Sequence, residues 1–143
     1  MTDVSTTYVP LTAAQRGLWA AQLTIGDVPI AVAQCIRIDG TLDVAAVLAS
    51  MRRAYRELRV ATGPVVATPD GPRLCLNDKD FDIETVDLRG RPTPTAAAEQ
   101  WMADACGRPM GLDTDDLLTT ALLRVGDDRW FLFTRAHHIL LDG

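Results

Sequence analysis

The sequence has little lysine, few histidines and cysteines, and no long apolar run. Lys79 is the only lysine, and the 14 basic residues are outnumbered by 19 acidic ones, which gives a formal net charge of -5. A negative chain repels phosphate backbones overall, so the charge argues against a nucleic-acid partner. No stretch approaches the roughly 20 apolar residues that span a bilayer. Residues 1–7 lack the basic and apolar regions of a signal peptide. We therefore expect no membrane association.

Cysteine is too scarce and too scattered to form a disulfide framework. Cys35, Cys75 and Cys106 are far apart, none belongs to a C-x-x-C pair, and an odd number cannot all pair internally. Reduced cysteines are typical of a cytosolic compartment. The sequence therefore predicts a cytoplasmic protein.

The composition that remains is ordinary for a globular protein. The 143 residues are 48% hydrophobic and 23% charged, which excludes a disordered or collagen-like chain. A chain of this length is close to one domain and buries roughly 68–70% of its unfolded surface.

Hydrophobic periodicity and turn residues predict alternating helices and strands. A 3.6-residue period predicts helices at 11–23, 43–58 and 95–106, with Thr12 as an N-cap. Apolar runs between Gly, Pro and Asp residues predict strands at 30–38, 73–76, 82–88, 117–125 and 129–136. The last two are separated by a short hairpin loop. This order predicts an α/β fold, a two-layer sandwich with a mixed sheet.

The chemistry-bearing residues gather after the last predicted strand. His137 and His138 are the chain's only histidines, Asp142 follows His138 by four positions, and Gly143 comes next. Consecutive strand residues point to opposite faces, so we expect one histidine in a cleft and the other packed or hydrogen-bonded behind the sheet. Histidine is the usual general base near neutral pH. An acid nearby can brace the loop, and a glycine leaves its N–H free to donate.

Taken by themselves, these residues leave other interpretations open. Two histidines can simply end a strand as structural residues. A zinc site fits poorly, because adjacent ligands diverge and no third histidine or cysteine lies nearby in sequence.

Three stretches in the same order resemble motifs of one enzyme family. Residues 137–143 match every fixed position of HHxxxDG, the signature of the condensation domains of nonribosomal peptide synthetases. Residues 11–19 resemble that family's first motif, SxAQxRLW, with Thr12 in place of Ser and Gly17 in place of the motif Arg. Residues 55–59 are a degraded form of the next motif, around RHExLR, with Glu57 and Arg59 as candidate matches.

The resemblance implies a fold and a reaction. The family's fold resembles chloramphenicol acetyltransferase, with two α/β lobes in a V and the active site between them. Residues 1–143 resemble the N-terminal lobe, without the C-terminal lobe, and about the first third of a complete family member. The implied reaction is amide formation, in which an amine on an acceptor carrier attacks a thioester carbonyl on a donor carrier.

The same resemblance implies roles for the motif residues. His138 is the catalytic histidine, as a general base or as a group that positions the attacking amine. His137 supports it, Asp142 braces the loop through an ion pair, and the Gly143 N–H faces the developing oxyanion. The residues of both early motifs are expected to hold the lobe together more than to touch substrate.

No resident cofactor is expected. The sequence lacks G-x-G-x-x-G and Walker motifs. The resemblance implies phosphopantetheine arms supplied by the partner carrier proteins. We expect the donor carrier to arrive in trans, because the first motif begins near residue 11, and a peptidyl carrier to present the acceptor.

Two other functions remain open. One is a stand-alone HxxxD acyltransferase that uses a coenzyme A or carrier thioester. The other is a non-catalytic lobe or carrier-binding module, since a single lobe forms only one wall of the tunnel. We expect the 143-residue chain to be a piece of a longer enzyme, inactive alone and prone to self-association.

Overall fold

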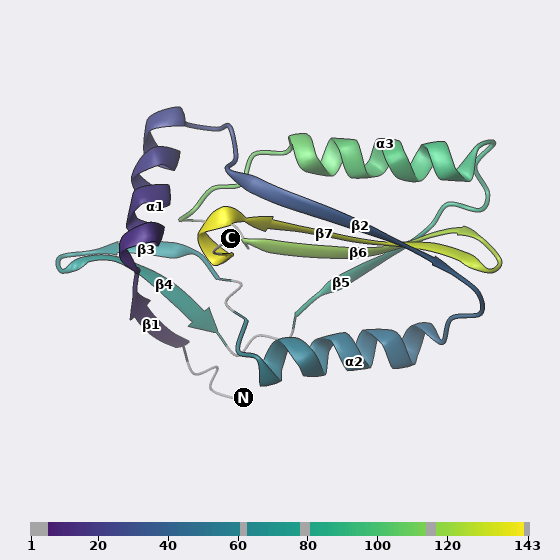
Figure 1. The fold of residues 1–143 in the computed structure, drawn as a ribbon, viewed down its shortest axis with the longest axis horizontal. Helices are drawn as coiled ribbons and strands as arrows, with labels where there is room; N and C mark the ends of the chain where they lie inside the picture. The colour runs from purple at the N-terminus through teal and green to yellow at the C-terminus, as the bar shows by residue number, and fades with distance from the viewer. Residues whose placement is uncertain (1–5, 61–62, 78–80, 114–116, 142–143) are drawn as a thin grey trace.

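The chain forms an α/β fold in which helices lie beside a twisted sheet (Figure 1). The computed structural model describes residues 6–60, 63–77, 81–113 and 117–141. The elements in chain order are β1 (Thr6–Pro10), α1 (Ala13–Ile25), β2 (Ala31–Asp39), α2 (Val44–Glu57), β3 (Val65–Thr68), β4 (Gly71–Asn77), β5 (Ile83–Asp87), α3 (Pro94–Gly107), β6 (Leu118–Gly126), β7 (Arg129–His137) and the 3₁₀ helix η1 (His138–Leu140).

The main sheet is mixed, as the sequence predicts. Its four described strands lie in the order β2-β7-β6-β5. Strand β7 pairs antiparallel with β2 and with β6, whereas β5 and β6 are parallel. Parallel neighbours need a crossover connection, and α3 supplies it between β5 and β6. Strand β7 is therefore an inner strand, and its C-terminal end carries the two histidines.

Helices approach the main sheet from both faces. Helix α3 covers one face, where the ring of Trp101 meets Phe133 edge to face at 5.8 Å between centroids. Helix α2 lies toward the other face, where the Tyr55 hydroxyl is 3.5 Å from the Thr120 hydroxyl. Alternate residues along the strands point to opposite faces of the sheet and therefore contact different helices. Figure 1 shows α2 and α3 on opposite sides of the strands.

A second, antiparallel sheet packs beside α1. Its described strands have the order β1-β4-β3. A core beneath it joins residues from this sheet, from the loops around it and from η1. Its buried members are Leu11, Val65, Leu74, Met110, Leu112, Leu117 and Ile139. Because Ile139 is only 1% exposed, this core fixes the turn that follows β7.

Strand β2 forms an exposed edge of the main sheet. Val32 and Ile36 are 43% and 46% exposed, and only Ile38 of this strand is half-buried. The free side of β2 faces no other described strand. An unpaired edge with apolar side chains is available for further pairing.

The predicted helices and strands are confirmed within a few residues at each end. The structure adds β1, which the sequence analysis did not predict, and shows that residues 65–77 form a hairpin of β3 and β4. The apolar stripe of α2 is half-buried, since this helix contains no fully buried residue. None of the described helices is long and apolar enough to cross a membrane.

Candidate active site

The two histidines lie where β7 ends and η1 begins, and their side chains have different surroundings. His137 is the last residue of β7 and is 0% exposed. His138 is the first residue of η1 and is half-buried. The expected divergence of adjacent side chains is confirmed. Of the two, only His138 is reachable from solvent.

His137 is held in one neutral form by hydrogen bonds at both ring nitrogens. Its Nδ1 accepts the N–H of Ile139 at 3.1 Å, so Nδ1 carries no proton. Its Nε2 lies 3.0 Å from Oε1 of Gln22 and donates to that oxygen. Burial, and then the positive charges of His138 and Arg135, hold the pKa of His137 below its ordinary value of 6.5. His137 is therefore a neutral structural partner of the turn.

His138 is held in the opposite tautomer. Its Nδ1 is 2.8 Å from the carbonyl oxygen of Leu141. A carbonyl oxygen can only accept, so Nδ1 carries the proton. In the neutral ring Nε2 then has a free lone pair, and no described residue donates to it. A lone pair at a half-buried site can accept a proton from an incoming amine or hold that amine in place.

The first predicted motif supports this turn directly. Gln15 donates from Nε2 to the carbonyl oxygen of Ile139 at 2.8 Å. Its Oε1 accepts the N–H of Thr12, and the Thr12 hydroxyl accepts the N–H of Gln15, a capping box at the start of α1. Leu18 and Trp19 of the same motif pack against the core that contains Ile139. These contacts are structural, as expected, and Gln15 connects them to the His138 turn.

The other motif residues do not meet the histidines in the described part of the chain. Gly17 is an exposed residue of α1 with open space where a Cβ would stand. Glu57 pairs with Arg53 on the surface of α2 at 2.7 Å, and Arg59 has a left-handed backbone with φ 49.

Asp142 and Gly143 lie outside the described residues. Their expected roles as a loop brace and as an oxyanion donor stay predictions.

Gln22 is the site residue that the sequence analysis missed. Gln22 is the buried residue of α1: it is 6% exposed, and its amide faces His137. The sequence offers no signal for this contact, because the two residues are 115 positions apart.

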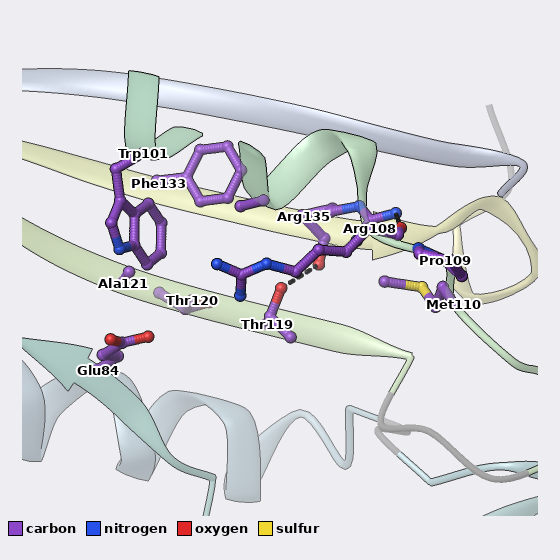
Figure 2. Close-up of a pocket in the computed structure, with 11 residues that line it drawn as sticks. Glu84, Trp101, Arg108, Pro109, Met110, Thr119, Thr120, Ala121, Phe133 and Arg135 are labelled. Atoms are coloured by element: carbon purple, nitrogen blue, oxygen red, sulfur yellow. Dashed lines mark hydrogen bonds between the residues drawn. The ribbon is translucent and has the colours of Figure 1, made fainter. Parts of the chain in front are cut away.

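A separate pocket of about 300 Å³ lies between α3 and strands β5, β6 and β7 (Figure 2). Arg108 extends across it, with its guanidinium carbon 5.9 Å from the centroid of the Trp101 ring, and Glu84 lies on the opposite wall. Arg135 is buried in the wall and donates to the carbonyl oxygen of Arg108 at 2.6 Å. The histidines do not line this pocket, so it is distinct from the His138 site.

No three His, Cys, Asp or Glu residues in the described ranges lie close enough together to hold a metal ion.

The comparison with family models decides the family. The model described as "Condensation domain" matches residues 5–143. The chain belongs to the condensation domain family. The α/β fold with a mixed sheet and the HH pair at the end of β7 agree with this assignment.

Curated relatives of this condensation domain chain are nonribosomal peptide synthetases. It is 32% identical to the dimodular nonribosomal peptide synthase of Bacillus subtilis (strain 168), over 100% of this chain and 6% of the relative. It is 32% identical to an isonitrile lipopeptide synthase of Streptomyces coeruleorubidus, over 94% of this chain and 9% of the relative. The chain thus spans a small part of each relative.

Solved condensation domains share the fold. The starter condensation domain of rhizomide synthetase RzmA superposes with a TM-score of 0.86 at 31% identity, covering 96% of this chain and 34% of that one. A variant of the same domain in complex with C8-CoA and Leu-SNAC gives a TM-score of 0.87 at 30% identity, over 96% of this chain and 32% of that one. The chain covers about a third of these domains.

Proposed function

We propose that the protein carrying this chain forms amide bonds between a thioester-bound acyl or aminoacyl donor and an aminoacyl acceptor in nonribosomal peptide synthesis. Membership of the condensation domain family gives the reaction class. The observation that carries the proposal is the geometry of His138 at the end of an inner strand. Its Nδ1 proton is held by the carbonyl oxygen of Leu141, and no described residue donates to its Nε2.

The proposed step needs a group that takes a proton from nitrogen. The acceptor amine attacks the thioester carbonyl, a C–N bond forms, and the C–S bond breaks. His138 Nε2 receives the proton that the amine loses and returns it to the departing thiolate. If the amine's proton leaves by another route, the same lone pair still orients the amine toward the carbonyl.

The neighbouring residues are given supporting roles in this proposal. His137 holds the backbone of the turn through the N–H of Ile139. Asp142 braces the loop, and the N–H of Gly143 donates to the oxyanion of the tetrahedral intermediate. These two roles come from the motif positions alone.

The proposed substrates are thioesters on phosphopantetheine arms of two carrier proteins, with the donor carrier arriving in trans. One solved RzmA variant holds C8-CoA and Leu-SNAC, a thioester donor and a thioester-linked amino acid, which supports this chemistry for the family. We assign residues 1–143 to the N-terminal lobe, facing a C-terminal lobe across the substrate tunnel, and expect this lobe alone to be inactive. Cytoplasmic location stays a prediction from the cysteines and the N-terminus.

The test is a His138→Ala variant of the full-length protein. Single-turnover assays with carrier-bound donor and acceptor should show amide formation reduced by about 10²–10⁴-fold. Gln100→Ala, at an exposed position on α3, is the matched control and should turn over normally. Wild-type turnover in His138→Ala contradicts the assigned role. Acyl transfer to a free small amine or alcohol, without transfer to a carrier-bound acceptor, favours the stand-alone acyltransferase instead.

A further inference from the structure

The Gln22 side chain joins the end of α1, the following turn and β7 through one buried amide. Its Nε2 donates to the carbonyl oxygens of Gly26 at 2.6 Å and Val28 at 2.9 Å. Its Oε1 accepts from the N–H of Ile30 at 2.9 Å and from Nε2 of His137 at 3.0 Å. All four partners meet a side chain that is 6% exposed. The amide has no hydrogen-bonding capacity left over.

These partners fix which way the amide points. The two carbonyl oxygens can only accept, so they require the NH₂ end of Gln22. The N–H of Ile30 can only donate, so it requires Oε1. His137 therefore meets an acceptor and must carry its proton on Nε2. Its Nδ1 is then free to accept the N–H of Ile139, which is the bond observed.

The same network reaches His138 by a second route. Ile30 gives its N–H to Gln22 and accepts the backbone N–H of His138 at 2.8 Å on its carbonyl oxygen. One route therefore runs through His137 to the N–H of Ile139, and the other runs through Ile30 to the N–H of His138. Both fix the backbone of the turn that carries the His138 ring.

We propose that Gln22 is a positioning residue for the condensation reaction: it fixes the neutral Nε2–H form of His137 and, through His137 and Ile30, the orientation of His138. This inference rests on the proposed role of His138. Gln22 acts through other residues and touches no reacting atom.

A glutamate at this position separates positioning from packing, since it has nearly the same shape. Its carboxylate still accepts from Ile30 and His137, but it cannot donate to the carbonyl oxygens of Gly26 and Val28. Its negative charge also favours a doubly protonated His137. A protonated Nδ1 cannot accept the N–H of Ile139, so the turn loses one of its anchors.

The experiment compares wild type, Gln22→Glu and Gln100→Glu in the full-length protein. Gln100 is also a helix glutamine, but its amide donates to Asp104 on the exposed surface of α3. The imidazole ¹⁵N shifts of His137 and His138, assigned with His137→Gln and His138→Gln variants, report tautomer and charge. Single-turnover and steady-state assays give kcat and KM.

We expect wild-type His137 to be the neutral Nε2–H form. Gln22→Glu should protonate His137 at neutral pH, shift the His138 ring signals, and lower kcat by about 10²-fold with KM nearly unchanged. Gln100→Glu should leave spectra and kinetics at wild-type values. A purely structural role for Gln22 predicts lost folded protein with unchanged imidazole signals in the fraction that folds.

The proposal is overturned if wild-type His137 carries its proton on Nδ1, or if Gln22→Glu changes neither spectrum nor kcat. It is also overturned if either readout changes without the other. If Gln22→Glu does not fold, the same spectra and kinetics are measured on Gln22→Met. Together with the tautomer of wild-type His137, they distinguish the same outcomes. If the wild-type protein forms no amide, the proposed function fails, while the tautomer and charge of His137 still decide whether Gln22 controls the turn.

Discussion

At the scale of single residues, adjacent histidines acquire different chemistry from their surroundings. His137 is buried and bonded at both ring nitrogens, to Ile139 and Gln22. His138 is bonded at Nδ1 alone among the described contacts. The same side chain therefore serves once as a fixed structural link and once as a group with a free lone pair.

The buried histidine should make folding sensitive to pH. The pKa of native His137 lies below 6.5 because of burial, whereas the unfolded chain binds its proton near pH 6.5. Between these pKa values the unfolded state binds more protons, so this site's contribution to the free energy of unfolding falls as pH drops from about 7.5 to about 5.5. Urea unfolding at both pH values measures how steeply the free energy of unfolding depends on pH.

A His137→Gln variant provides the comparison for that slope. It should have a smaller difference in unfolding free energy between the two pH values, whatever its absolute stability. An unchanged slope in His137→Gln would remove His137 as its source.

At the scale of elements, α1 connects the small sheet to the turn that carries His138. Its first turn holds Ile139 through Gln15, and its last turn holds His137 through Gln22. Both ends of one helix thus act on the same few residues of β7 and η1. The stability of α1 should therefore matter for the site as well as for the fold.

Two glycines, one inside α1 and one at its C-terminal end, should respond oppositely to alanine. Gly17 lies within the helix and is exposed, with open space around the position of an added Cβ, so Gly17→Ala should raise the free energy of unfolding by about 0.5–1 kcal/mol. Gly26 ends the helix with φ +69, where an alanine is strained, so Gly26→Ala should lower it by about 1 kcal/mol. Urea titration of the two variants measures both, and two changes of the same sign would contradict this assignment.

The sequence predicts elements best where a pattern is long and local. The period of residues 43–58 and the turn at 126–128 require only neighbours, and α2 and the β6–β7 hairpin follow them closely. Strand β1 is five residues long and ends in Pro10, and its partner β4 is distant in the chain. Such a strand forms because it pairs with a distant segment, and the local sequence pattern does not contain that information.

The candidate site likewise has features that the sequence predicts and features that depend on the tertiary fold. The motif predicts the position of His138, but its tautomer depends on the carbonyl of Leu141, a contact set by the turn. Gln22 fits an amphipathic helix as well as any polar residue. Its role depends on burial against a histidine that only the tertiary fold supplies.

At the scale of the whole molecule, the exposed edge of the main sheet dominates the expected solution behaviour. Val32 and Ile36 on β2 are apolar, exposed and adjacent to unpaired backbone groups. Exposed apolar edges promote pairing between chains. The described part of the main sheet therefore has an exposed apolar edge at which chains can associate.

A single charge should reduce this tendency. We expect the 143-residue chain to self-associate, and Ile36→Lys to lower its apparent mass in sedimentation without lowering secondary structure. Glu84→Lys, at an exposed position on β5, tests whether any added lysine has the same effect. A monomeric wild-type chain with a cooperative melt would contradict the prediction.

The pairing of β2 with β7 also has a consequence for biosynthesis. Gln22 and His137 are 115 residues apart, and ribosomes add about 5–20 residues per second. Helix α1 therefore waits about 6–23 s for its partner residue in β7 to be made. Strand β2, whose paired residues span Ala31↔His137 to Asp39↔Arg129, waits about 5–21 s. During that time β2 has no partner strand, so Val32 and Ile36 stay exposed on the emerging chain. We expect chaperones to bind this exposed segment before the two histidines have been synthesised.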